Sequence, residues 1–142
     1  MRTFLIIVSF FLTSSQCNAQ KLDGEWKGLF FDRYTNESYP IKLYFVSDSW
    51  DTYKVYSYSK GKDRNGNDTT IVCKVFYKVI WKDSICLEEA KVLLPKKADE
   101  ACLQKMFLKI KKRESGLILE GTWKIASKKC NDDSGTISLT KQ

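Results

Sequence analysis

The chain contains no histidine among its 142 residues and only two prolines. The lack of histidine removes the usual general base near neutral pH, the Ser-His and Cys-His nucleophile pairs, and the commonest zinc ligand. The sequence also has no Cys-x-x-Cys, no phosphate-binding loop and no Gly-x-Ser-x-Gly motif. We therefore predict a protein that is not an enzyme and that uses no cofactor and no metal ion.

Long hydrophobic runs are missing beyond the first residues of the chain. Residues 1–19 have the form of a signal peptide, with a positive charge at Arg2, a short apolar core and a cleavage site of small residues. A lipid anchor on Cys17 is disfavoured, because Gln16 stands where a small residue is required. We expect residues 20–142 to be exported to the periplasm or the extracellular space as one monomeric domain without a transmembrane segment.

The cysteines agree with export, because four of them remain beyond the signal peptide, an even number in an oxidising compartment. A tight hairpin turn between Cys73 and Cys86 would place these two residues about 20 Å apart along the strand, which is beyond disulfide reach. Cys102 and Cys130 each stand at the beginning of a predicted strand, at the same end of the molecule. We therefore predict a Cys102–Cys130 disulfide, with Cys73 and Cys86 as buried thiols.

Alternation of apolar and polar residues predicts eight strands and no extended helix. The expected strands cover residues 22–31, 39–46, 52–59, 70–81, 84–94, 103–112, 117–126 and 135–141. A short helical turn is expected only at 96–101. Eight consecutive strands with short connections favour an all-β, up-and-down antiparallel barrel, because closure removes the exposed edges of a flat sheet.

The Gly-x-Trp-Lys sequence occurs twice, at Gly24-Glu25-Trp26 and at Gly121-Thr122-Trp123. The first copy resembles the Gly-x-Trp start of lipocalin-like (calycin-type) barrels, in which the tryptophan closes one barrel end. The later order of Gly-x-Trp, Cys130 and Gly135-x-Ile137 is similar to that of small secreted bacterial β-barrels. The resemblance implies an eight-stranded barrel whose lumen holds a small apolar or amphiphilic ligand. Since the first and last strands of a closed barrel are neighbours, we also expect both tryptophans at one end or layer of the same core.

The expected ligand site combines inward apolar side chains with one carboxyl group. Its predicted members are Trp26, Tyr77, Trp81, Glu88, Met106 and Trp123. One of the adjacent Glu88 and Glu89 must face the lumen, since neighbouring side chains point to opposite sides of a strand. A tight turn after Trp81 makes it Glu88, opposite Tyr77, whereas a three-residue loop makes it Glu89. A buried glutamate would have a raised pKa and could bind a hydroxyl or an amine, or it could only bond to Tyr77 or to a lysine.

Lysines on two strands give the chain a second candidate surface. They are Lys74, Lys78 and Lys82 on one strand and Lys105 and Lys109 on another. With Phe76 and Phe107 among them, these lysines would suit an anionic glycan, although a solvated barrel exterior, where lysines protect strands from aggregation, is the simpler explanation. Export argues against nucleic acid as the partner. The alternative to a ligand-binding barrel is therefore a non-enzymatic accessory protein of the cell envelope, with a solid core and a basic surface that contacts an envelope protein.

Overall fold

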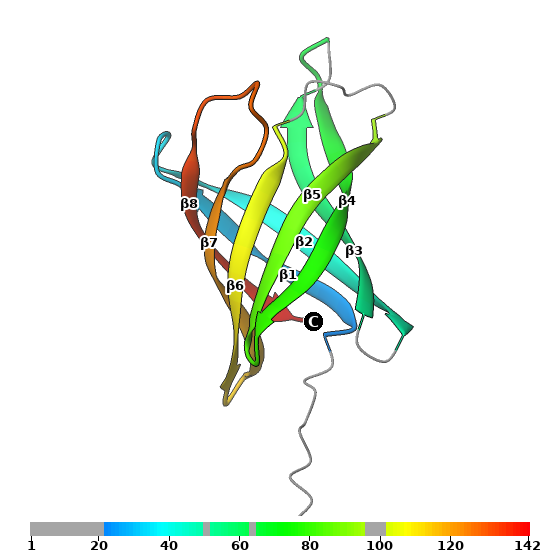
Figure 1. Ribbon diagram of the computed structural model, residues 1–142. Coiled ribbons are helices and arrows are strands. Elements are labelled where there is room, and N and C mark those ends of the chain that lie inside the picture. The colour runs from blue at the N-terminus through cyan, green and yellow to red at the C-terminus, as the bar shows by residue number, and fades with distance from the viewer. Residues whose placement is uncertain (1–21, 50–51, 63–64, 96–101) are drawn as a thin grey trace, which may run out of the picture.

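The computed structural model describes residues 22–49, 52–62, 65–95 and 102–142, which form a closed barrel of eight antiparallel strands (Figure 1). The strands are β1 (Gly24–Asp32), β2 (Glu37–Ser49), β3 (Thr52–Lys62), β4 (Asp68–Trp81), β5 (Ser84–Leu94), β6 (Gln104–Arg113), β7 (Gly116–Ile125) and β8 (Ser134–Lys141). They follow chain order around the barrel, and β8 pairs with β1 to close it. The predicted up-and-down barrel is therefore confirmed.

The described residues contain strands and turns but no helix, and hence no helix long and apolar enough to cross a membrane. The predicted signal peptide, residues 1–19, and the predicted helical turn at 96–101 lie outside the described residues.

The two ends of the barrel differ in their connections (Figure 1). At the upper end lie the last residues of β1, β3, β5 and β7 and the first residues of β2, β4, β6 and β8. The lower end carries the β4–β5 and β6–β7 hairpins, and β1 begins there. Side chains near the upper end and near the lower end therefore belong to separate candidate surfaces.

Apolar side chains fill the middle of the lumen, because alternate residues of every strand point inward. Those that are at most 2 % exposed include Trp26, Leu43, Phe45, Leu87, Met106, Leu108, Leu119 and Leu139. The Phe45 ring contacts Trp26 and Tyr77 at centroid distances of 6.3 and 6.4 Å. Protein side chains thus occupy the middle layers of the barrel.

The two tryptophans of the Gly-x-Trp repeat are both buried in this core, but at opposite ends of β1. The indole N–H of Trp26 donates to the carbonyl oxygen of Leu22, just before β1, at 2.8 Å. The indole N–H of Trp123 donates to the carbonyl oxygen of Phe31, close to the last residue of β1, at 3.0 Å. The expectation of a shared end or layer is therefore wrong, because the register of β7 and β8 against β1 places Trp123 nearer the upper end.

Glycine is required where strands approach each other most closely. A Cβ atom on Gly121 would collide with the carbonyl oxygen of Phe107 on β6, and one on Gly135 would collide with that of Phe31 on β1. Where the backbones of two strands lie this close, there is no room for a side chain. Glycine is required at position 24 for a different reason, because its φ of 108° lies in a region that other residues rarely adopt. The two glycines of the repeated motif therefore meet different constraints.

The predicted Cys102–Cys130 disulfide is present, with a Cα–Cα distance of 5.8 Å. It joins the residues before β6 to the connection between β7 and β8. The backbone N–H of Leu103 reinforces this junction by donating to Ser127 Oγ at 2.9 Å. Cys73 and Cys86 are free and buried. The disulfide therefore fixes the beginning of β6 to the β7–β8 connection and not to β5.

Candidate functional site

A bulge at Ile80 sets the register of β5 against β4 and decides which side chains enter the lumen. The predicted tight turn is present, because Trp81 is opposite Ser84. Val79, however, is opposite Ile85, which leaves Ile80 without a partner on β5. A shift of one residue reverses the faces of all the pairs that follow.

Two predicted lumen residues consequently lie outside the lumen. Trp81 is 69 % exposed at the end of β4, where the bulge interrupts the alternation. Glu88 is opposite Phe76 rather than Tyr77, and its carboxylate forms an exterior ion pair with Lys105 at 2.8 Å. Leu87 takes the expected place of Glu88 opposite Tyr77. The predictions for Trp81 and Glu88 were therefore wrong.

The other predicted lumen residues belong to the packed core. Trp26, Met106 and Trp123 are at most 2 % exposed. Tyr77 is partly buried toward the lower end, where its ring lies 5.2 Å from that of Tyr53. These side chains fill the space that they were expected to line.

Glu89 faces the lumen and is only 7 % exposed. It is opposite Val75, and a second irregularity follows at Ala90, which has no partner on β4. Ser57 Oγ donates to Glu89 Oε1, and the backbone N–H of Gln104 donates to Glu89 Oε2 at 2.9 Å. Strands β3, β5 and β6 thus converge on a single carboxyl group. The sequence offered Glu89 only as the alternative to Glu88.

The pairing between β5 and β6 ends next to this carboxyl group. It runs from Ser84 opposite Lys109 to Glu88 opposite Lys105 and goes no further among the described residues. Above this point the two strands diverge (Figure 1). The backbone N–H of Gln104 would otherwise bond to β5, and the Glu89 carboxyl replaces that missing acceptor. Glu89 therefore stands where the barrel wall loses its backbone hydrogen bonds.

Polar side chains from neighbouring strands complete the Glu89 cluster, which we define as Ser57, Cys73, Glu89 and Gln104. Ser57 and Cys73 are opposite each other on β3 and β4 and are 1 % and 2 % exposed. The side-chain Oε1 of Gln104 is buried and has no hydrogen-bond partner in the described part of the chain. An acceptor buried in this way is costly unless a donor reaches it. The cluster therefore has unused capacity for a donor.

The electrostatics of the cluster are dominated by burial. Burial raises the pKa of the Glu89 carboxyl above its usual value, and the hydrogen bonds from Ser57 and Gln104 offset this only in part. Burial and the nearby Glu89 charge raise the pKa of the Cys73 thiol to about 12. No ion pair to Glu89 is formed within the described ranges, and these ranges hold no group of three potential metal ligands. The cluster is suited to hydrogen bonding rather than to nucleophilic chemistry.

The five lysines of the predicted basic surface lie on the barrel exterior, but acidic residues separate them. Lys105 is paired with Glu88 at 2.8 Å, and Lys109 is paired with Asp83 at 3.9 Å. Lys74, Lys78 and Lys82 are exposed on β4 and its turn and form no ion pair with the described residues. Because Glu88 on β5 and Asp83 in the β4–β5 turn lie among these lysines, the expected continuous basic surface is interrupted.

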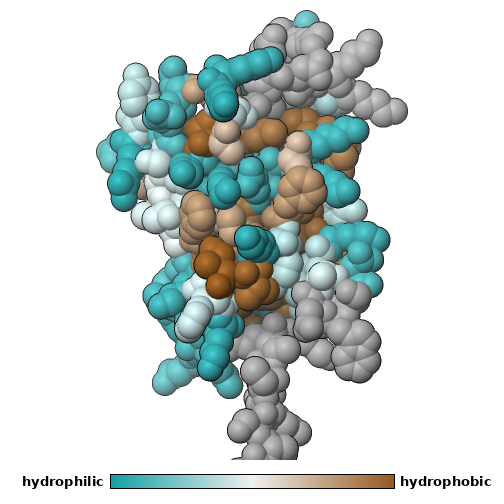
Figure 2. Space-filling model, viewed as in Figure 1, coloured by the Kyte–Doolittle hydropathy of each residue, from teal (hydrophilic) through white to brown (hydrophobic). Residues whose placement is uncertain are grey.

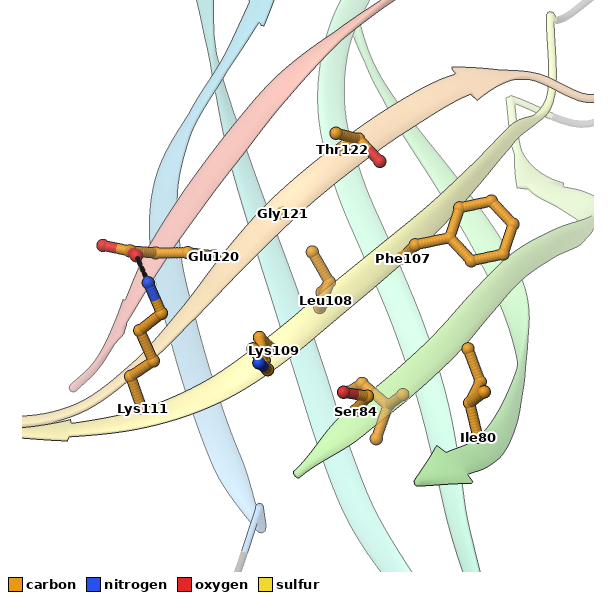
Figure 3. Close-up of a pocket in the computed structure, with 10 residues that line it drawn as sticks. Ile80, Ser84, Phe107, Leu108, Lys109, Lys111, Glu120, Gly121 and Thr122 are labelled. Atoms are coloured by element: carbon orange, nitrogen blue, oxygen red, sulfur yellow. Dashed lines mark hydrogen bonds and ion pairs between the residues drawn. The ribbon is translucent and has the colours of Figure 1, made fainter. Parts of the chain in front are cut away.

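A shallow exterior groove of about 490 Å³ crosses strands β4 to β7 (Figure 3). Ile80 and Phe107 lie toward one side of it, and Lys111 bonds to Glu120 at 2.7 Å on the other side. Phe107 is 38 % exposed, and the Nζ atoms of Lys105 and Lys124 lie 5.9 and 6.0 Å from its ring centroid. This groove offers apolar contact area but no buried titratable group.

Comparison with known proteins identifies no family for this chain. No family model matches the chain, and no curated protein matches it. Among solved structures, the chain is similar to a redesigned β-barrel at 14 % sequence identity and a TM-score of 0.46, over 85 % of this chain and 91 % of the other. The protein is an eight-stranded antiparallel β-barrel. Its relationship to lipocalin-like barrels stays a prediction.

Proposed function

We propose that this barrel binds a small amphiphilic molecule at the upper end of its lumen, with a hydroxyl or amine group of that molecule on Glu89. The observation that carries the proposal is a carboxyl group buried in the lumen without a cationic partner among the described residues. Burying such a group costs free energy unless it is compensated, so buried carboxyls with shifted pKa values concentrate at functional sites.

The chemistry around Glu89 indicates the class of ligand. A protonated Glu89 can donate to a hydroxyl group, and an ionised Glu89 can accept from an ammonium group. The unpartnered Oε1 of Gln104 accepts a second hydrogen bond from either group. A ligand carboxylate would meet the negative charge of Glu89 and no compensating cation. The polar end of the ligand is therefore an alcohol or an amine.

The apolar part of the ligand would contact partly exposed side chains that face inward near the upper end. These are Tyr39 and Ile125, which pack against the core, and Ile71, which is two residues from Cys73 on β4. The packed layers below them leave the middle of the lumen filled. A short apolar chain or a single ring is thus a better match than a long acyl chain.

A second candidate function is recognition of an envelope protein by the exterior wall. Apolar side chains gather on the face that β4, β5 and β6 form (Figure 2). Phe76 is 62 % exposed and Phe107 is 38 % exposed on this face. Exposed aromatic residues are enriched at protein interfaces, which favours this function over binding of an anionic glycan.

Calorimetric titration of the purified protein with a medium-chain alkyl amine, alcohol and carboxylate of equal length tests the lumen site. We expect the amine and the alcohol to bind and the carboxylate not to bind. Glu89→Gln should weaken amine binding by about tenfold or more, since a charged hydrogen bond is lost. Glu88→Gln is the matched control, because it removes the adjacent carboxylate on the exterior. Equal effects of the two variants, or no binding of any probe, would contradict the proposal.

A further inference from the structure

We infer that the lower end of the barrel docks on the surface of an anionic lipid bilayer, with the end of the β4–β5 hairpin entering the headgroup region. We call residues 78–82 the hairpin tip. The inference does not depend on the lumen site, which lies near the opposite end of the barrel.

The hairpin tip exposes three consecutive apolar side chains. Val79 and Ile80 are each 51 % exposed, and Trp81 is 69 % exposed. The bulge at Ile80 contributes to this arrangement, because regular alternation would have turned Trp81 toward the lumen. Tryptophan prefers the membrane–water interface, where its ring is buried and its N–H remains hydrated. The tip therefore has the composition of an interfacial anchor.

Positive charges surround these apolar residues. Lys78 and Lys82 flank them directly, and neither forms an ion pair with the described residues. The β6–β7 hairpin lies alongside, because Ile110 N donates to Asp83 O at 2.6 Å. Residues 78–84 and 109–120 together carry six lysines and arginines against three acidic residues. The lower end thus combines an apolar tip with an excess of positive charge.

This combination favours an anionic bilayer over the other possible occupants. Lysine stems can lie along apolar surface while their ammonium groups reach lipid phosphates. Two copies of the chain that met through this tip would bring like charges together, which opposes self-association. An acidic glycan would satisfy the lysines but would leave Ile80 and Trp81 in water. Only a surface with both anionic groups and an apolar layer complements the whole tip.

Co-sedimentation of the purified protein with phospholipid vesicles tests the inference. We expect binding to vesicles that contain phosphatidylglycerol, little binding to pure phosphatidylcholine, and weaker binding as salt is added. Each of Lys78→Gln and Lys82→Gln should reduce the partition constant by about fivefold. The double variant Ile80→Ser/Trp81→Ser should abolish binding, whereas Phe76→Ser, which removes an exposed aromatic side chain from the barrel wall, should leave it unchanged.

Quenching of tryptophan fluorescence by brominated lipid identifies the inserted residue independently of affinity. We expect strong quenching in the wild-type protein and little in Trp81→Phe, which should still bind. Circular dichroism of each variant verifies that the barrel is folded. The inference is overturned if phosphatidylglycerol vesicles do not bind the protein, if Phe76→Ser weakens binding as much as the tip variants, or if the tip variants instead dissociate a dimer seen by light scattering.

Discussion

The backbone N–H of Gln104 donates to Glu89 Oε2 over 2.9 Å, at the point where β6 no longer has β5 as its hydrogen-bonded neighbour. A side-chain carboxyl thereby performs a task that a main-chain carbonyl performs elsewhere in the barrel. The carbonyl does not titrate, but the carboxyl does. The upper part of the β5–β6 wall is consequently sensitive to pH and to substitution of one residue.

Glu89 should make the stability of the barrel fall as pH rises above about 4.5. The folded pKa of Glu89 is raised above its ordinary value of 4.5. At lower pH both the folded and the unfolded chain hold this proton, so the group contributes no pH dependence. As pH rises through 4.5 the unfolded chain ionises first, and the free energy of unfolding decreases until the folded pKa is passed.

Urea denaturation at a series of pH values checks this expectation. In Glu89→Gln, the free energy of unfolding should no longer decrease with pH through this group. Glu88→Gln should retain the decrease, because Glu88 is an exterior ion-pair partner of Lys105. An identical pH dependence of wild type and Glu89→Gln would show that the carboxyl is not the responsible group.

The Cys102–Cys130 disulfide should contribute about 3–4 kcal/mol to the free energy of unfolding. The estimate follows from the sequence separation of 28 residues, because the bridge restricts the unfolded chain. Denaturation of the Cys102→Ser/Cys130→Ser variant measures the loss. Reductant should destabilise the wild type by the same amount and leave the double variant unaffected; a reductant effect on the variant would point to another cause.

Cys73 should be unreactive toward alkylating reagents in the native protein. Its pKa of about 12 leaves almost no thiolate near neutral pH, and burial limits access to the sulfur. Burial also raises the pKa of Cys86. Iodoacetamide labelling followed by mass spectrometry should detect both thiols only after denaturation. Rapid labelling of Cys73 in the folded protein would refute its burial.

Replacement of Gly121 by alanine should destabilise the barrel by about 1–3 kcal/mol or more, because the new Cβ would displace the backbone of β6 at Phe107. Thr122→Ala is a suitable comparison, since Thr122 is adjacent and exposed. Its cost should stay below about 1 kcal/mol. Thermal denaturation of both variants distinguishes a collision with the β6 backbone from a general loss of strand preference. Equal destabilisation of the two variants would favour the second explanation.

Local patterns predicted most of the fold because they act within a few residues. The clean alternation before Lys78 and the turn residues after Trp81 place β4, its hairpin and the opposing β5 correctly. The disulfide followed from the same strand order. These features need no knowledge of distant contacts.

The site was harder to predict because it depends on the bulge at Ile80. Val79, Ile80 and Trp81 are all apolar, so the alternation pattern does not reveal which of them lacks a partner. The unpaired residue, Ile80, alone decides whether Glu88 or Glu89 faces the lumen. Burial of Glu89 also requires Ser57 on β3 and Gln104 on β6, and such long-range contacts leave no trace in the local sequence.

The bulge at Ile80 also determines how two distant parts of the molecule can vary separately. Deleting this one residue would restore regular pairing without changing any other pair, because Val79 is already opposite Ile85 and Trp81 is already opposite Ser84. Glu89 would keep its place in the lumen, whereas the hairpin tip would lose one of its three exposed apolar side chains. Homologous chains that are one residue shorter between Tyr77 and Ser84 should therefore retain the buried carboxyl group.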